Sequence, residues 1–228
     1  MRPGTVRAQS APAIGLDSPL WRLESSTNGV ALFSAPAHSS GLIPFKAVMS
    51  IPGTIAEVSM VLEDIARRRD WIARYGESRL LERTSDYEQL EYLRVVMPWP
   101  VAHRTTLIRV RITVSDDQRT ATIAAASVDS SARDTLPVHV RAHAYASTFQ
   151  MTQQGDRVEV ASLVFIDPRG HIPKWVVNYF TSGVARTTLE GLRRQVARHL
   201  YPGAELAAMQ QRIAAYHTHR ELRASAPE

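Results

Sequence analysis

The feature that most constrains the fold is a run of six strand-like segments followed by one long helical segment. The six segments are rich in β-branched and apolar residues, and short polar turns separate most of them: residues 77–84, 87–97, 105–114, 120–128, 138–152 and 157–166. Connections of a few residues join antiparallel strands, whereas parallel strands need long crossovers. The pattern therefore predicts an antiparallel meander.

The helical segment that follows is expected to cover one face of this sheet. Pro173 suits the first turn of a helix, and apolar residues then recur every three to five positions to about residue 200. The stripe that we expect to be buried comprises Trp175, Val176, Tyr179, Phe180, Val184, Leu189, Leu192 and Val196. A sheet cannot bury a concave face alone, so the predicted class is α+β, a curved antiparallel sheet wrapped around a long C-terminal α-helix. Because a helix does not fill a strongly curved surface, we expect an internal hydrophobic cavity.

Shorter elements are expected before this framework. Asn28-Gly29 predicts a turn, and residues 30–33 and 45–51 have the composition of two strands in a hairpin-like opening. Thr54 stands three residues before Glu57, a spacing typical of a capping box. A helix is therefore expected to begin just after Thr54.

The two ends of the chain differ from its middle. Residues 1–18 are rich in Pro, Ala and Ser, and a further helix is expected over 204–223. We divide the chain into a flexible N-terminus (1–18), one main domain (19–200) and a helical extension with a tail (201–228).

The composition excludes whole classes of chemistry. The 228 residues include no cysteine, which removes disulfides, thiol nucleophiles, iron–sulfur clusters and cysteine-based zinc sites. The common nucleophile, phosphate-loop, dinucleotide and zinc-protease motifs are missing from the sequence. His139 and His143 share a strand face but would lie about 13 Å apart, too far to hold one metal ion by themselves. We expect no catalytic residue, no metal and no cofactor.

The charge of the chain favours an anionic partner. The net charge is +5 and the isoelectric point is near 9.9, which suits nucleic acid or a membrane surface. Arg67, Arg68 and Arg69 form the one dense basic run, which we interpret as a solvated helix face. Basic residues are not interleaved with aromatic ones on one definable surface, so we expect no nucleic-acid partner.

The cellular location is an expectation from the N-terminal residues. They carry an early arginine but lack the apolar run of a signal peptide, and no uninterrupted apolar stretch is long enough to span a bilayer. We expect a cytoplasmic protein, or a periplasmic one if an upstream signal has been removed.

A loop stiffened by two prolines is the first of two unusual segments. Pro98 and Pro100 break the strand and leave Met97, Trp99 and Val101 in the loop. A tryptophan in such a loop either fills the core or anchors the protein at a membrane interface. Both interpretations stay open from sequence.

The second unusual segment covers residues 167–178. A Pro-x-Gly turn leads directly into the long helix and places Asn178 on or near its buried stripe. A buried asparagine needs hydrogen-bond partners, which could come from the sheet or from a ligand headgroup.

At these two segments the sequence resembles the START family, the steroidogenic-acute-regulatory-related lipid transfer domains, and the resemblance covers nearly the whole chain. The matches are to the family's recurring tryptophan, its Pro-x-Pro…Arg-Asp loop, its Val-Arg strand and the start of its C-terminal helix, and they stand here as Trp71, Pro98-Trp99-Pro100 with Arg104, Val140-Arg141-Ala142 and residues 167–178. Each motif is weak alone, but their order and spacing agree. One position departs from the family, since Thr105 stands where an Asp is usual. The ion pair or turn that this Asp supports is therefore in doubt.

The resemblance implies a helix-grip fold with a tunnel that holds one lipid or sterol. It also implies that the ligand is carried or sensed without chemical change, so that the chain is not an enzyme. Two alternatives stay open. The same cavity could serve a polyketide cyclase or aromatase-like enzyme, and the extra helix from residue 204 could belong to a ligand-sensing protein-interaction module.

Strand alternation suggests which charges face the tunnel. Glu91 alternates with Leu93 and Val95, so we expect it to point inward. An opposite-charge pair with Arg109 or Arg111 could hold a hydroxyl or headgroup, although alternation on their own strand favours an outward direction for both arginines.

The remaining expected contacts lie on the loop and the helix. The predicted ligand-binding residues are Glu91, Trp99, Arg109, Trp175, Val176, Asn178 and Tyr179. A gate that also touches the membrane is predicted at Met97, Trp99, Val101 and Pro173, because the loop and the start of the helix must part to admit a ligand. The expected partners are one lipid or sterol and a transient membrane surface.

Overall fold

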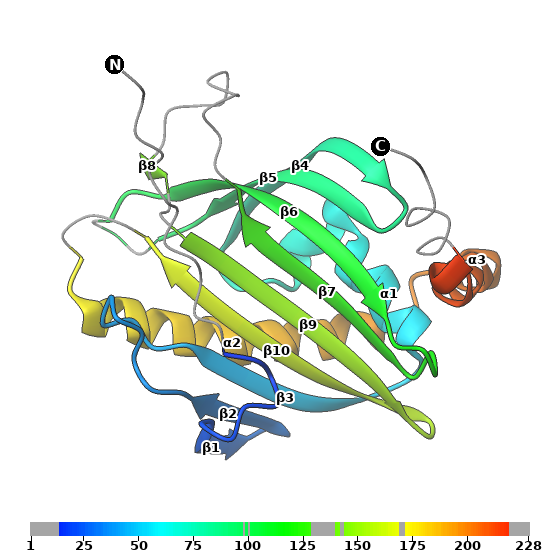
Figure 1. Cartoon of the computed structure of the whole chain (residues 1–228), viewed down its shortest axis with the longest axis horizontal. Coiled ribbons are helices and arrows are strands. Elements are labelled where there is room, and N and C mark those ends of the chain that lie inside the picture. The colour runs from blue at the N-terminus through cyan, green and yellow to red at the C-terminus, as the bar shows by residue number, and fades with distance from the viewer. Residues whose placement is uncertain are drawn as a thin grey trace.

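The computed structural model of the chain describes residues 14–97, 99, 101–128, 140–141, 144–168 and 172–218. Its strands are β1 (Arg22–Thr27), β2 (Val30–Ser34), β3 (Phe45–Pro52), β4 (Tyr75–Ser85), β5 (Glu88–Val95), β6 (Arg104–Val114), β7 (Thr120–Ser127), β8 (Val140–Arg141), β9 (Ala144–Gln154) and β10 (Arg157–Asp167). They form one sheet in the order β1-β2-β3-β10-β9-β7-β6-β5-β4, and the short β8 pairs with β6. The sheet curves around a long helix (Figure 1).

The predicted antiparallel meander is confirmed. Every neighbouring pair along the main path of the sheet is antiparallel, and only β8 runs parallel to its partner β6. The strand predicted over 138–152 is observed as β9 from residue 144, while residues 129–139 lie outside the described part of the chain. Sequence analysis missed β1, which pairs with β2 across the predicted Asn28-Gly29 turn.

Irregular pairing bends the outer edge of the sheet. The register of β4 against β5 shifts between Tyr75 and Glu77, between Leu80 and Glu82, and again near Ser85. Each extra residue bends the strand and increases its twist, so these bulges help to curl β4 and β5 over the concave face.

The first helix begins where the sequence predicts. Helix α1 (Ile55–Glu63) is capped by Thr54, whose hydroxyl accepts a hydrogen bond from the Glu57 backbone N–H at 3.3 Å. The Glu57 carboxylate in turn accepts from the Thr54 backbone N–H at 2.7 Å, which completes the capping box. A 3₁₀ helix, η1 (Ile65–Asp70), follows and leads to the buried Trp71.

The long helix α2 (Lys174–Val196) lies across the concave side of the sheet (Figure 1). It packs against β2, β3, β10 and α1. The second half of its predicted stripe is confirmed, because Leu189, Leu192 and Val196 are buried in the main core.

In the first half of the predicted stripe, Val176, Phe180 and Val184 are half-buried, but the prediction is wrong for its two other aromatic residues. Trp175 is 72% exposed and Tyr179 is 81% exposed, whereas Val177, Thr181 and Ala185 face the protein interior. The aromatic residues have helical spacing, but the face that approaches the sheet carries small and β-branched side chains, which allow closer packing.

A third helix, α3 (Gly203–Ala214), packs against α1. Arg212 forms an ion pair with Glu63, and its backbone carbonyl accepts a hydrogen bond of 2.7 Å from the Tyr87 hydroxyl. The extension predicted after residue 200 therefore packs on the rest of the fold, and its contacts continue past α3 to Tyr216 and His217. None of the described helices combines the length and apolar character needed to cross a bilayer.

Candidate functional site

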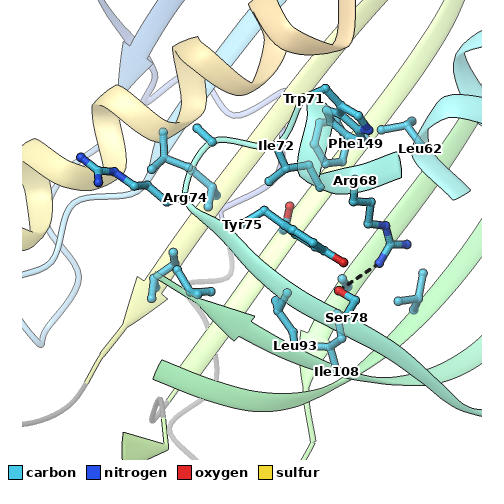
Figure 2. Close-up of a pocket in the computed structure, with 18 of the residues that line it drawn as sticks. Leu62, Arg68, Trp71, Ile72, Arg74, Tyr75, Ser78, Leu93, Ile108 and Phe149 are labelled. Atoms are coloured by element: carbon cyan, nitrogen blue, oxygen red, sulfur yellow. Dashed lines mark hydrogen bonds between the residues drawn. The ribbon is translucent and has the colours of Figure 1, made fainter. Parts of the chain in front are cut away.

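A cavity of about 110 Å³ lies on the concave face of the sheet, beside η1 and α2. Its walls are mostly apolar and come from six strands and the segment after η1, with Trp71, Leu93, Ile108, Ile123, Phe149 and Val164 among the lining residues. Figure 2 shows several of these side chains converging on the same space. A mostly apolar hollow of this kind suits an apolar ligand.

One buried ion pair stands at the wall of this cavity. Glu91 is fully buried, and its carboxylate accepts hydrogen bonds from both terminal nitrogens of Arg68, with Nη2 and Oε1 3.2 Å apart. Gln89 Nε2 donates to the same Oε1 at 2.6 Å. Because the carboxylate is satisfied from two sides, its charge is compensated in a dry environment.

The arginine of this pair, rather than the glutamate, reaches the cavity. Arg68 and Ser78 both line it, and Arg68 Nη1 donates to Ser78 Oγ at 3.5 Å, as the dashed line in Figure 2 marks. Glu91 is buried, as strand alternation predicts, and holds Arg68 in place from behind. The two residues thus offer a fixed cation beside a hydroxyl at an otherwise apolar wall.

The pair between Glu91 and Arg109 or Arg111 that the sequence allows does not form, in agreement with the outward direction that strand alternation favours for both arginines. Arg109 and Arg111 lie on the outer face of the sheet, where both bind Glu88, at 2.6 and 3.1 Å. Burial tends to raise the pKa of the Glu88 carboxyl, but the hydrogen bonds from the two guanidinium groups outweigh burial and lower that pKa. Arg109 is therefore not part of the cavity wall.

A signal for Arg68 existed in the sequence. In a 3₁₀ helix the side chains at positions i and i+3 lie on the same face, and Arg68 precedes the buried Trp71 by three residues. The interpretation of the basic run 67–69 as a solvated helix face therefore holds for two of its three arginines. Arg68 is buried, whereas Arg67 and Arg69 lie at the surface.

Arg104, at the start of β6, connects the end of the proline loop to the residue that follows β10. The buried Arg104 donates from Nε to the backbone carbonyl of Pro168 and from Nη1 to that of Ala102, and burial lowers the pKa of this guanidinium. Met97 is buried at the base of the loop, while Trp99 is 93% exposed. Trp99 therefore does not fill the core, and its role as an anchor at a membrane interface stays a prediction.

The predicted contacts on α2 are placed outside the cavity. Asn178 Oδ1 accepts a hydrogen bond of 3.0 Å from the Ile43 backbone N–H, so its partner is the loop before β3. Pro173 is exposed, and Val176 and Tyr179 border an open groove on the outer side of α2. Within the described part of the chain, none of the seven predicted ligand-binding residues lines the cavity itself. Their roles towards a ligand stay predictions.

No metal site is found where the structure can be described. Among these residues, no group of three or more potential metal-ligating side chains comes together. His139 and His143, whose spacing argued against a shared metal, lie outside the described residues.

A curved antiparallel sheet that grips a C-terminal helix over an apolar cavity defines the helix-grip class, and the comparisons name the family. The START domain profile matches residues 4–204, so the chain belongs to the START domain family. The resemblance stated from sequence is thereby confirmed.

Relatives and solved structures agree with this assignment. An uncharacterised protein of Pseudomonas aeruginosa is 26% identical over 76% of this chain and 85% of its own length. The phosphatidylcholine transfer protein of Bos taurus is 26% identical over 72% of this chain and 78% of its own length. The crystal structure of a STAR-related lipid transfer protein from Xanthomonas axonopodis is 25% identical, with a TM-score of 0.69, over 78% of this chain and 99% of that one. Human StAR-related lipid transfer protein 5 shares the fold, with a TM-score of 0.72 at 16% identity, over 81% of this chain and 90% of that one.

Proposed function

We propose that the protein binds one lipid in its internal cavity and carries it between membranes, or senses it, without changing it chemically. The observation that carries this proposal is the apolar cavity with a single compensated ion pair at its wall. Membership of the START family and the likeness to phosphatidylcholine transfer proteins support it.

The side chains around the cavity favour a carrier over an enzyme. Among the described lining residues the charged groups are Arg68, Arg74 and Arg94, and neither a carboxylate nor an imidazole is present. General acid and base catalysis needs a group that exchanges a proton near neutral pH, whereas arginine stays protonated. The wall can therefore bind and orient a ligand but offers no proton-transfer pair.

The energy of binding comes from burial of apolar surface. Each methylene group moved out of water contributes about 0.8 kcal/mol, so an acyl chain alone supplies enough for tight binding. Arg68 and Ser78, held in position by Glu91, would give the otherwise apolar wall one polar position that orients the bound chain.

Binding of a whole lipid requires the cavity to expand. Ligand pockets commonly measure about 300–1,000 Å³, and the cavity in this structure measures about 110 Å³. We propose that α2 and the segments beside it move apart when a lipid enters. This movement would occur on the membrane, where the lipid is available.

The membrane contact is proposed at the exposed aromatic residues. Trp99 on the proline loop and Trp175 and Tyr179 on α2 are largely exposed, although aromatic side chains of this size are usually buried. Tryptophan and tyrosine prefer the headgroup level of a bilayer, where the ring is apolar and one end is wet. The basic net charge of +5 would add attraction to an anionic surface.

Mass spectrometry of intact protein purified under native conditions tests the proposal. We expect one lipid or sterol per protein, identified in the organic extract and lacking from a mock purification. An empty protein that also fails to bind sterols, fatty acids and phospholipids would overturn the carrier function.

A further inference from the structure

A second hollow, the outer groove, lies beside the cavity, and the few residues that line both spaces form a thin wall between them. It measures about 770 Å³ and is bordered by α2 and the segment after η1. Ala73, Arg74 and Val184 line both this outer groove and the inner cavity. Two of these three side chains are small, so little material separates the two spaces.

The wall is fastened to α2 at one end. A Cβ atom at Gly191 would collide with the backbone carbonyl of Trp71, which shows how closely the two backbones approach there. Further towards the groove, Ala73 donates its backbone N–H to Thr188 Oγ1 at 3.3 Å. Beyond that bond, the Arg74 guanidinium lies over the ring of Phe180 on α2, 5.7 Å from its centroid. The part of the wall nearest Val184 is therefore the part most easily opened.

Arg74 is one of two arginines on the outer groove. Its backbone has a φ of 60°, a conformation uncommon for a residue with a side chain, and the side chain is exposed. Figure 2 shows it pointing away from the other labelled residues, towards α2. Among the described residues, no carboxylate forms an ion pair with it.

The second arginine on the outer groove is Arg186, which lies on α2. It donates from Nη2 to Ser25 Oγ, while its buried Nε has no acceptor within the described part of the chain. A buried N–H without an acceptor is costly, so the protein's own groups do not fully satisfy this guanidinium. The described lining of the groove includes no aspartate or glutamate.

We propose that the outer groove is the headgroup subsite for an anionic phospholipid, whose acyl chain passes between Arg74 and Val184 into the inner cavity. The inference rests on the proposed function and names the ligand class. Two guanidinium groups on a surface free of carboxylates match a phosphate, which accepts paired hydrogen bonds from arginine. The apolar residues between them, such as Phe180 and Val176, match the glycerol end of the acyl chains.

A transfer assay with matched surface charge tests this subsite. All donor vesicles contain phosphatidylcholine with the same fixed fraction of phosphatidylglycerol, and only the trace fluorescent lipid differs, being either phosphatidylglycerol or phosphatidylcholine. Any preference then reflects recognition of the lipid and not attraction to the membrane. The variants are Arg74→Gln, Arg186→Gln and the double variant, and the control is Arg83→Gln, an exposed arginine on β4 that removes the same charge.

We expect the wild type to transfer phosphatidylglycerol faster than phosphatidylcholine. In the double variant the rate of phosphatidylglycerol transfer should fall about tenfold, whereas the rate of phosphatidylcholine transfer should change less than about twofold. Arg186→Lys should restore part of the loss, which a folding defect would not allow. Equal transfer of both lipids by the wild type, or equal loss of both in the variants, would overturn the subsite and leave the carrier function standing. A wild type that transfers neither lipid would overturn both.

Discussion

The two halves of α2 are built differently. In its second half, residues 185–196, seven residues are buried: Ala185, Thr188, Leu189, Gly191, Leu192, Gln195 and Val196. In its first half, residues 174–184, only Val177 and Thr181 are buried, and two large aromatic side chains are exposed. We refer to the second half with η1, α1 and α3 as the closed end, and to the first half with the proline loop as the exposed end.

This difference separates stability from function along one helix. Leu189 and Leu192 are fully buried, and a buried leucine contributes about 1.5–3 kcal/mol relative to an exposed one. The closed end can therefore stay packed while the exposed end moves. A carrier needs this combination, because its cavity must open without unfolding the domain.

The largest effect is expected from the buried ion pair at the closed end. Glu91→Gln would leave the Arg68 guanidinium buried without its counter-charge and should cost roughly 3–5 kcal/mol of unfolding free energy. Urea unfolding followed by circular dichroism measures this cost. Glu88→Gln is the matched control, since Glu88 lies on the same strand and also binds arginine, but on the solvated face. There the cost should be about 0–1 kcal/mol, and equal costs for both variants would contradict the assigned roles.

Two glycines of α2 offer the next comparison. Gly191→Ala would drive its Cβ into the Trp71 carbonyl and should destabilise the protein by about 1–3 kcal/mol, because backbone must shift to relieve the collision. Gly183→Ala has no atom within 4 Å of the new Cβ and should stabilise the helix by up to about 1 kcal/mol. In thermal unfolding, the midpoint temperature should fall for Gly191→Ala and rise for Gly183→Ala if the two halves of α2 differ as described. The same sign for both would contradict the tight approach at Gly191.

At the exposed end the expected effect is on membrane affinity and not on stability. Trp99→Ala and Trp175→Ala should each weaken binding to vesicles by up to about tenfold, because a tryptophan at the interface contributes on the order of 1 kcal/mol. Their unfolding midpoints should stay close to that of the wild type, since both side chains are largely exposed. Leu80→Ala, an exposed apolar residue on β4, serves as the control in sedimentation with vesicles. Loss of binding in the control alone would place the contact on another surface.

The framework of the fold could be predicted because its signals are local. Alternating apolar residues, polar turns and the Thr54 capping box each depend on residues close in sequence, and the sheet, α1 and α2 follow from them. The family resemblance rests on motifs of the same local kind.

The site could not be predicted because its partners meet only in the fold. Glu91 was correctly expected to be buried, but its partner Arg68 comes from η1, and no pattern on β5 indicates that η1 approaches it. The stripe on α2 failed for a related reason. Trp175 and Tyr179 have helical spacing, yet the closest approach to the sheet requires the smaller Val177 and Thr181.

The smallest expected effect is the pH dependence of the closed end, where Asp64 joins η1 to the chain after α2. Burial tends to raise the pKa of the Asp64 carboxyl, but hydrogen bonds from Arg67 and from the Tyr201 hydroxyl, at 3.1 Å, outweigh burial and lower that pKa. Burial and the same carboxylate raise the pKa of Tyr201 to about 12, so the hydroxyl stays a donor across the neutral range.

A carboxyl whose pKa is lower in the folded state stabilises the fold above its unfolded value of about 3.9, and this contribution is lost as the pH falls through the folded value. Asp64→Asn should therefore differ from the wild type in urea midpoint at pH 7, and the difference should shrink as the pH falls below about 4. Parallel unfolding series at several pH values measure it. The difference should be smaller than that caused by Glu91→Gln, because Asp64 and Arg67 are closer to solvent. A constant difference at all pH values would show that the charge of the Asp64 carboxylate does not contribute to stability.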